Sequence, residues 1–271
     1  MHAADLQRPP AGALYVDHVS HFVADLDAAA GVFEALGFRV TPASAQRTPE
    51  GPVGASNRCV MLEAGYIELL SPTHDTPAAG RMRALMARYD GVHLVCFGTP
   101  DAQGEHARLA AHGFSPQPLV DLQRETSSGT VRFKVVRPAP EAMPEGRIQF
   151  VEQLTPELIW QAADVNPFRL GEVYVAAAEP AAAAARWAEF SALLPRAAAG
   201  TVRLDADRGA IVFGPPVEGI AAPGIVGYSL ACRRPEALAA RCAQLGIAVR
   251  RVGARRVARL PAALGGYLVF G

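Results

Sequence analysis

Short apolar runs alternate with stretches of helical periodicity along the chain, and the alternation follows one plan four times. Each repeat opens with a strand-like run, continues with a helical stretch, and closes with two or three further strand-like runs. A proline or an acidic residue stands near each helix start, and a glycine follows three of the four helices. The opening strand and helix of the four repeats span residues 18–38, 93–114, 172–190 and 227–247. The pattern predicts an α+β fold of four βαβββ units.

The four units pair naturally along the chain into two domains. We expect the first domain at residues 12–155 and the second at 168–271. The segment 154–168 between them reads as a linker, in which Thr155 or Pro156 begins a short helix. The alternative is one large α+β domain without repeat symmetry.

Composition and charge narrow the class of protein. Half of the 271 residues are hydrophobic and 19% are charged, which is typical of a folded globular chain. The formal net charge is zero, so nothing favours a nucleic-acid or membrane partner. No apolar run reaches membrane-spanning length, and the N-terminal segment lacks the pattern of a signal peptide. Four cysteines without CxxC spacing indicate a reduced protein, which we expect in the cytoplasm. The preference for arginine and alanine is typical of a GC-rich genome.

Polar residues interrupt the apolar strands at matching points of the first two units. Glu68 lies in the strand-like run GYIELLSP, where an unpaired carboxylate would be costly to bury. His18 and His93 lie in the first strands of the two units, and Gln149 matches Glu68 in the second unit. Two imidazoles and two oxygen ligands suit a divalent first-row metal better than calcium or magnesium. The set His18, Glu68, His93 and Gln149 therefore predicts a metal site between the two units.

These residues can also be explained without a metal site. A single strand histidine is more often a core residue than a ligand, and Glu68 can instead pair with a buried arginine, Arg58 first. The matching positions of the last two units hold Glu172, Ile211, Gly227 and Leu268, which cannot bind a metal. The second domain is then a degenerate copy that completes the fold, shapes a cavity or mediates dimerisation. Five arginines between Arg250 and Arg259 favour either a phosphate contact or an exposed edge.

The segments DHVSHFVADLDAAAGVF, GASNR and YIEL resemble the vicinal oxygen chelate superfamily, and most of all its glyoxalase-like domain group. The resemblance implies two tandem domains with cupped mixed sheets, the second of them degenerate. It implies that His18, Glu68 and His93 are metal ligands for one nickel, zinc, manganese or iron ion. The fourth ligand of glyoxalase I is a glutamate, where this chain has Gln149.

The same resemblance implies a chemistry and a substrate site. Superfamily enzymes chelate two neighbouring oxygens of a substrate, and Glu68 would shuttle a proton as the general base. Asn57 and Arg58, and less strongly Arg132, would hold a carbonyl or carboxylate of the substrate. We expect a metal-dependent lyase or isomerase acting on a small oxygenated metabolite. The alternative is a non-catalytic binder like the bleomycin-resistance proteins. An extradiol dioxygenase is disfavoured, because it needs a carboxylate at position 149.

Overall fold

The structure is a computed structural model that describes residues 7–217 and 223–271. The first six residues of the N-terminal segment, which we interpreted as lacking a signal peptide, lie outside the described part. All four predicted βαβββ units are present, which confirms the α+β fold. The first unit consists of β1 (Tyr15–Phe22), α1 (Leu26–Ala35), β2 (Ser44–Thr48), β3 (Gly51–Ala64) and β4 (Tyr66–Pro72). The second consists of β5 (Val92–Gly98), α3 (Ala102–Ala111), β6 (Val120–Thr126), β7 (Gly129–Val136) and β8 (Arg147–Gln153).

The second half of the chain repeats the plan. The third unit consists of β9 (Asn166–Ala176), α5 (Pro180–Ser191), β10 (Pro195–Ala198), β11 (Thr201–Asp205) and β12 (Ala210–Gly214). The fourth consists of β13 (Gly224–Cys232), α6 (Pro235–Gln244), β14 (Val249–Val252), β15 (Arg255–Arg259) and β16 (Tyr267–Phe270). The connections contain α2 (Pro77–Met86), the 3-10 helix η2 (Pro140–Ala142) and α4 (Pro156–Ile159), which begins directly after Thr155 as expected.

Local sequence explains where the helices of the first half begin. Asp25 accepts hydrogen bonds from the backbone N–H groups of Asp27 and Ala28 at the start of α1. Asp101 caps α3 in the same way, and Thr76 caps α2 with its hydroxyl. Such side chains satisfy N–H groups that have no partner within the first helical turn.

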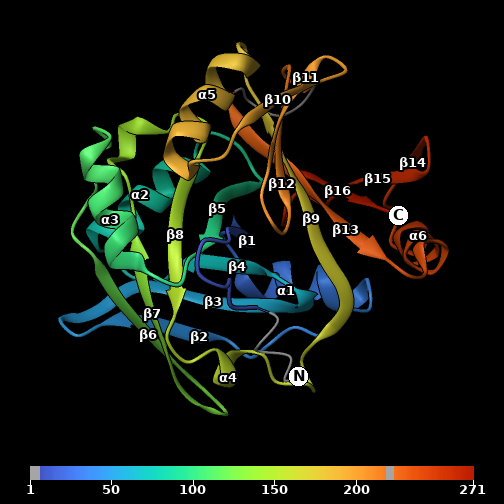
Figure 1. The fold of residues 1–271 in the computed structure, drawn as a ribbon. Helices are drawn as coiled ribbons and strands as arrows, with labels where there is room; N and C mark the ends of the chain where they lie inside the picture. Colours follow the sequence, from blue (N-terminus) through green and yellow to red (C-terminus); the bar gives the residue numbers. More distant parts are fainter. Residues whose placement is uncertain (1–6, 218–222) are drawn as a thin grey trace.

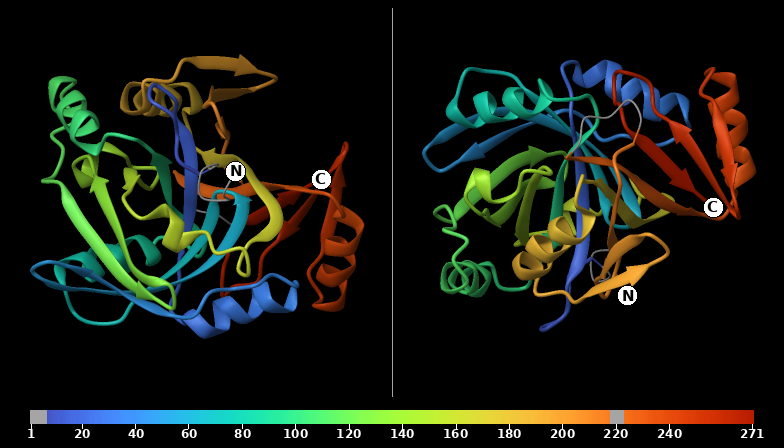
Figure 2. Two further views of the ribbon diagram at one scale, coloured as in Figure 1. Left: turned by 60° about the horizontal axis from the view of Figure 1, so that its bottom comes forward. Right: turned by 90° about the horizontal axis from the view of Figure 1, so that it is seen from above.

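The two halves use the same units to build different shapes (Figure 1). In the first half, β1 pairs with β4 and β5, and β2 pairs with β6, so eight strands close into a barrel. In the second half, β9 pairs with β13, but the sheet ends at β10 and β14 and stays open. Figure 2 shows this open sheet beside the barrel, with α6 on its outer side.

The halves are joined by backbone pairing and by a shared core. Strand β9 runs parallel to β3, and Ile225 of β13 pairs with Val92 of β5. One hydrophobic cluster contains buried side chains from both halves, such as Phe33 of α1 and Trp187 of α5. The boundaries 12–155 and 168–271 therefore mark the two repeated pairs of units. That these pairs are separate domains remains a prediction.

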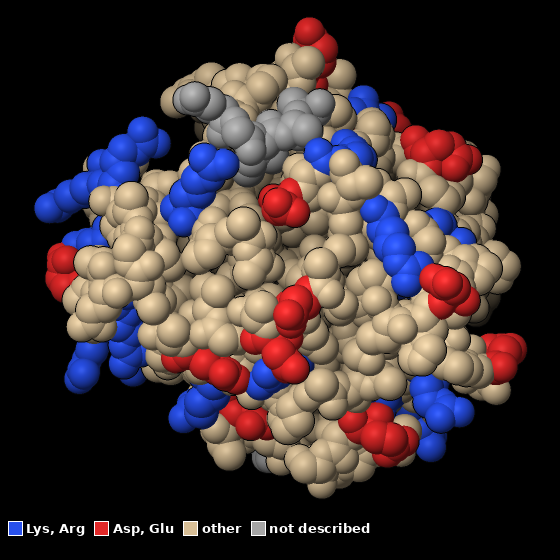
Figure 3. Space-filling model, turned by 180° about the vertical axis from the view of Figure 1, so that it is seen from behind, with Lys and Arg blue, Asp and Glu red and all other residues tan. Residues whose placement is uncertain are grey.

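Charges of both signs are interspersed on the face shown in Figure 3. This mixture agrees with the formal net charge of zero. A search of the described residues for a helix long and apolar enough to cross a membrane found none.

Candidate functional site

Glu68 lies inside the barrel of the first half, where three polar side chains surround its carboxylate. Its Oε2 accepts a hydrogen bond from the Ser20 hydroxyl at 2.5 Å. Its Oε1 accepts from the Asn57 amide at 2.6 Å and from the Gln46 amide at 3.1 Å. Glu68 is only 6% exposed, so these three donors replace the water that the carboxylate loses. The free-energy cost of burying this carboxylate is therefore offset by neutral hydrogen-bond donors and not by Arg58.

His18 faces the same carboxylate from the neighbouring strand. Its Nε2 lies 3.9 Å from Glu68 Oε2, and its Nδ1 is 2.7 Å from Asp17 Oδ1. Burial lowers the pKa of His18, but the interactions with Cys96 and Asp17 outweigh it and raise the pKa well above its ordinary value. The contact with the Asp17 carboxylate orients the His18 ring and favours its protonated form.

Four arginines line the small cavity next to His18 and Glu68. The cavity has a volume of about 60 Å³, which is room for about four to six water-sized groups. The arginines come from α2, β6, the end of β7 and the start of β8: Arg81, Arg124, Arg137 and Arg147. Of the side chains that line the cavity, only Glu68 is a carboxylate. The cavity therefore carries excess positive charge.

The arginines repel one another within the cavity. Burial lowers the pKa of Arg137 well below its ordinary value, and the charges of Arg147 and Arg81 lower it further. The pKa of Arg147 falls to about 10, through burial first and then through Arg81, while Glu68 opposes the change. Guanidinium groups remain protonated even when burial and neighbouring charges lower their pKa. An anion bound in the cavity would therefore reduce the repulsion between the arginines.

A larger and more apolar cavity of about 330 Å³ adjoins the first. Its lining includes Phe22, Leu85, Met143 and Ile148. Arg81, Met82, Arg137 and Arg147 line both cavities, so the two spaces meet at the arginines.

Three of the four predicted metal ligands lie at the polar cavity, but His93 does not. His18, Glu68 and Gln149 line it together. His93 is fully buried elsewhere: it stacks between Phe22 and Tyr89, and its Nε2 lies 2.8 Å from the carbonyl oxygen of Tyr89. Its side chain points to the opposite face of β5 from Leu94 and Cys96.

The strand register shows which residue of the second unit corresponds to His18. In the first unit His18 pairs with Tyr66, and Ser20 pairs with Glu68. In the second unit Leu94 pairs with Arg147, and Cys96 pairs with Gln149. Leu94 is therefore the counterpart of His18, and a leucine cannot ligate a metal.

The remaining donors do not fit the predicted four-ligand metal site. The Oε1 atom of Gln149, which would have to ligate the ion, accepts a hydrogen bond from Arg137 at 3.2 Å. The guanidinium groups around it would also repel a divalent cation. Across residues 7–217 and 223–271, no group of three or more His, Cys, Asp and Glu side chains is arranged to hold a metal ion.

Of the three predicted substrate-binding residues, one lies at the polar cavity and two lie elsewhere. Asn57 lines the polar cavity, and its Oδ1 is buried without a hydrogen-bond partner. Arg58, its sequence neighbour, points to the outer face of β3, where it pairs with Asp27 and Glu34 of α1. Arg132 is exposed and lies outside both cavities. Strand alternation explains both corrections, because adjacent residues face opposite sides of the sheet.

Several cavity residues were missed by sequence reasoning. Arg137 follows Phe133 and Val135 at a spacing of two, and this spacing places all three on the inner face of their strand. Arg81 and Arg147 had no comparable signal, because only the folded chain brings α2 and β8 to the same cavity.

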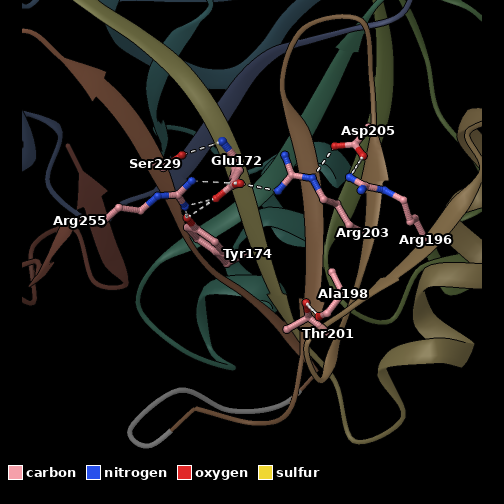
Figure 4. Close-up of polar contacts among 9 residues, drawn as sticks. All are labelled: Glu172, Tyr174, Arg196, Ala198, Thr201, Arg203, Asp205, Ser229 and Arg255. Atoms are coloured by element: carbon pink, nitrogen blue, oxygen red, sulfur yellow. Dashed lines mark hydrogen bonds and ion pairs between the residues drawn. The ribbon is translucent and has the colours of Figure 1, made fainter. Parts of the chain in front are cut away.

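The second half carries a network of charged side chains centred on Glu172 (Figure 4). Glu172 of β9 forms ion pairs with Arg203 and Arg255 and accepts a hydrogen bond from the Tyr174 hydroxyl at 2.7 Å. Burial raises the pKa of Glu172, but Arg255, Tyr174 and Arg203 outweigh it and lower the pKa to about 2. Arg255, one of the clustered arginines of the last unit, thus has a structural partner.

Comparison with solved structures finds the same fold in proteins of low sequence identity. A hypothetical protein from Staphylococcus aureus has a TM-score of 0.71 at 13% identity, covering 95% of this chain and 98% of that one. A mutant of 4-hydroxymandelate synthase from Streptomyces coelicolor has a TM-score of 0.62 at 14% identity, covering 95% and 92%. The Mn(II)-bound glyoxalase from Novosphingobium aromaticivorans has a TM-score of 0.58 at 9% identity, covering 94% and 81%.

The sequence itself gives the family. A comparison with curated proteins gave no match. The family model of the glyoxalase-like domain matches residues 16–191, which span the whole barrel and the beginning of the second half. This match covers more than half of the chain, and it confirms the resemblance seen in the first strands. The chain therefore belongs to the glyoxalase-like domain family.

Proposed function

We propose that the polar cavity of the barrel binds a small 2-hydroxy carboxylate. The convergence of Arg81, Arg137 and Arg147 on a space of about 60 Å³ carries this proposal. Guanidinium groups match the planar geometry of a carboxylate, and a bound carboxylate would relieve their mutual repulsion.

Asn57 and His18 supply the reason for a hydroxyl group beside the carboxylate. The Nδ2 of Asn57 must face Glu68, which only accepts hydrogen bonds, so Oδ1 of Asn57 faces the other way as an acceptor. This Oδ1 has no partner, and a ligand hydroxyl would donate to it. The His18 ring, whose protonated form is favoured, would donate to an oxygen of the ligand. Side chains of the protein would thus recognise two neighbouring oxygens of the ligand.

Isothermal titration calorimetry with three ligands of similar size tests the proposal. We expect lactate to bind, propionate to bind roughly three- to tenfold more weakly for want of the hydroxyl, and neutral lactamide not to bind. Arg81→Gln and Arg137→Gln should each weaken lactate binding by about tenfold or more. Arg83→Gln is the matched control, because Arg83 lies on the same helix, pairs with Asp75 and is absent from the cavity lining. Equal affinity of the control and cavity variants would contradict the proposal.

The arrangement of His18 and Glu68 favours a second candidate function, proton transfer by an isomerase or lyase. Asp17 holds Nδ1 of His18, so Nε2 is turned toward Glu68. In an isomerase step, Glu68 takes the proton from the carbon that bears the hydroxyl. The electron pair passes into the carboxylate held by the arginines, and a proton then returns to the same carbon.

Exchange of hydrogen for deuterium distinguishes the binder from the isomerase or lyase. In D₂O, an isomerase incorporates deuterium at the hydroxyl-bearing carbon of lactate, and Glu68→Gln abolishes the incorporation. A protein that binds lactate without incorporation is the non-catalytic binder. A rate that requires added nickel, zinc, manganese or iron would instead favour the metal-dependent enzyme expected from the sequence.

A further inference from the structure

The larger cavity beside the polar one is lined mostly by apolar side chains and opens onto the same arginines. Its volume of about 330 Å³ is several times that of the polar cavity, about 60 Å³. Its lining contains Pro138, Pro140 and Pro144, and prolines offer no backbone N–H group. The remaining wall consists of side chains such as Phe22, Leu85, Met143 and Ile148.

The polar groups of this cavity away from the shared arginines are already engaged. Arg88 donates to the carbonyl oxygen of Pro223 at 2.5 Å and lies against the ring of Tyr89. The amide of Gln117 donates to the carbonyl oxygen of Pro138 at 3.1 Å. Three of the four arginines in the lining, Arg81, Arg137 and Arg147, lie at the end shared with the polar cavity, so most of the positive charge available to a ligand is there.

We propose that the ligand is an amphipathic 2-hydroxy acid, with its carboxylate at the shared arginines and an alkyl or aryl group in the apolar cavity. This inference rests on the proposed binding of a carboxylate in the polar cavity. An apolar cavity of about 150 Å³ is enough to hold benzene, so the observed volume accommodates a ring or a chain of several carbons. Transfer of such a group from water is favourable in proportion to its apolar area.

The wall of the apolar cavity is held in place by a buried contact with the second half of the chain. Glu145, between the lining residues Pro144 and Gly146, is fully buried. Its carboxylate forms an ion pair with Arg186 and accepts a hydrogen bond from Trp187 Nε1 at 3.1 Å, both from α5. The segment that carries Met143 and Arg147 is thereby anchored before a ligand arrives, which reduces the entropy lost on binding.

Calorimetry with lactate, 2-hydroxyhexanoate and 3-phenyllactate tests the inference on the complete chain. We expect the two longer acids to bind about tenfold or more tightly than lactate, because only they reach the apolar cavity. Ala84→Phe places a ring into this cavity from an exposed position of α2. It should remove the advantage of the longer acids and leave lactate binding unchanged. Ala87→Phe is the matched control, since Ala87 is exposed at the end of α2 and lies outside the lining.

The outcomes separate this inference from the proposed function. If lactate binds and the longer acids bind no better, or if Ala84→Phe leaves their advantage intact, the apolar cavity is not the tail site and only this inference fails. If none of the three acids binds, the proposed function fails as well. Tight binding of the longer acids that Arg81→Gln does not weaken would also overturn the assignment of the carboxylate to the arginines.

Discussion

The imidazole of His18 is hydrogen-bonded to the carboxylate of Asp17, its neighbour in the sequence, at 2.7 Å. On a regular strand two adjacent side chains point to opposite faces. Here the register between β1 and β5 shifts between Val16 and His18, so Asp17 is an extra residue in its strand. Bulges of this kind re-aim a side chain. The irregularity orients the imidazole in the cavity, and the Gln153 amide donates to both oxygens of the Asp17 carboxylate, at 3.2 Å to Oδ1 and 3.3 Å to Oδ2.

His18 should titrate above its ordinary pKa of 6.5, and Asp17→Asn should lower the value. The raised pKa contributes stability that is fully present below pH 6.5 and is lost as the pH rises through the folded value. Binding of a carboxylate should weaken over the same rise in pH, because the ring loses its charge. Ring-proton resonances in NMR spectra measure the pKa, and a His18 signal that titrates below 6.5 would contradict this account.

Two other histidines should make the protein sensitive to acid. His21 and His93 are fully buried, and burial first of all lowers the pKa of each to about 4 from 6.5. Their neutral forms therefore contribute stability above pH 6.5 that is lost as the pH falls toward 4, by roughly 3 kcal/mol per ring. Urea unfolding at a series of pH values measures the loss.

His93→Gln should flatten that pH profile, since one of the two titrating rings is gone. His74→Gln is the control, because His74 is exposed and its removal should leave the profile unchanged. A His93→Gln profile that parallels the wild type would show that the buried ring does not govern acid sensitivity.

The position of Leu94 predicts how the cavity responds to a new metal ligand. Leu94→His combined with Gln149→Glu restores two imidazoles and two carboxylates at the four register-matched positions. We expect this double variant to bind zinc or nickel at least about a hundredfold more tightly than the wild type, as measured by calorimetry and elemental analysis. Wild-type protein that retains about one metal ion per chain, and loses it in His18→Ala, would refute the prediction.

Two glycines should respond in opposite directions to alanine. A Cβ on Gly227 of β13 would lie 2.1 Å from the carbonyl oxygen of Tyr267 on β16, so the strands would have to separate. We expect Gly227→Ala to cost roughly 2 kcal/mol or more. Gly31 lies inside α1 with nothing within 4 Å of a new Cβ, so Gly31→Ala should stabilise the protein by about 0.5–1 kcal/mol. Denaturant unfolding of both variants gives the two values, and equal signs would contradict the packing.

Sequence periodicity was sufficient for the fold but not for the contents of the cavity. The four units are predictable because each repeats the same strand and helix pattern, and Glu68 is predictable because a carboxylate is conspicuous in an apolar strand. His93 was misplaced by one position: it lies eight residues before Asp101, whereas His18 lies seven before Asp25. A shift of one residue turns a strand side chain to the other face. The cavity arginines come from separate elements, so their convergence depends on tertiary structure.

The open sheet of the second half has a consequence for how copies of the protein meet. A closed barrel buries its strand edges, whereas β10 and β14 each present one edge to solvent. Pro195 removes a hydrogen-bond donor from β10, and Arg196 beside it is paired with Asp205 of β11. Strand β14 carries Arg250 and Arg251, both exposed. Two copies that approached through β14 would bring like charges together, so these arginines disfavour pairing of this edge between neighbouring molecules.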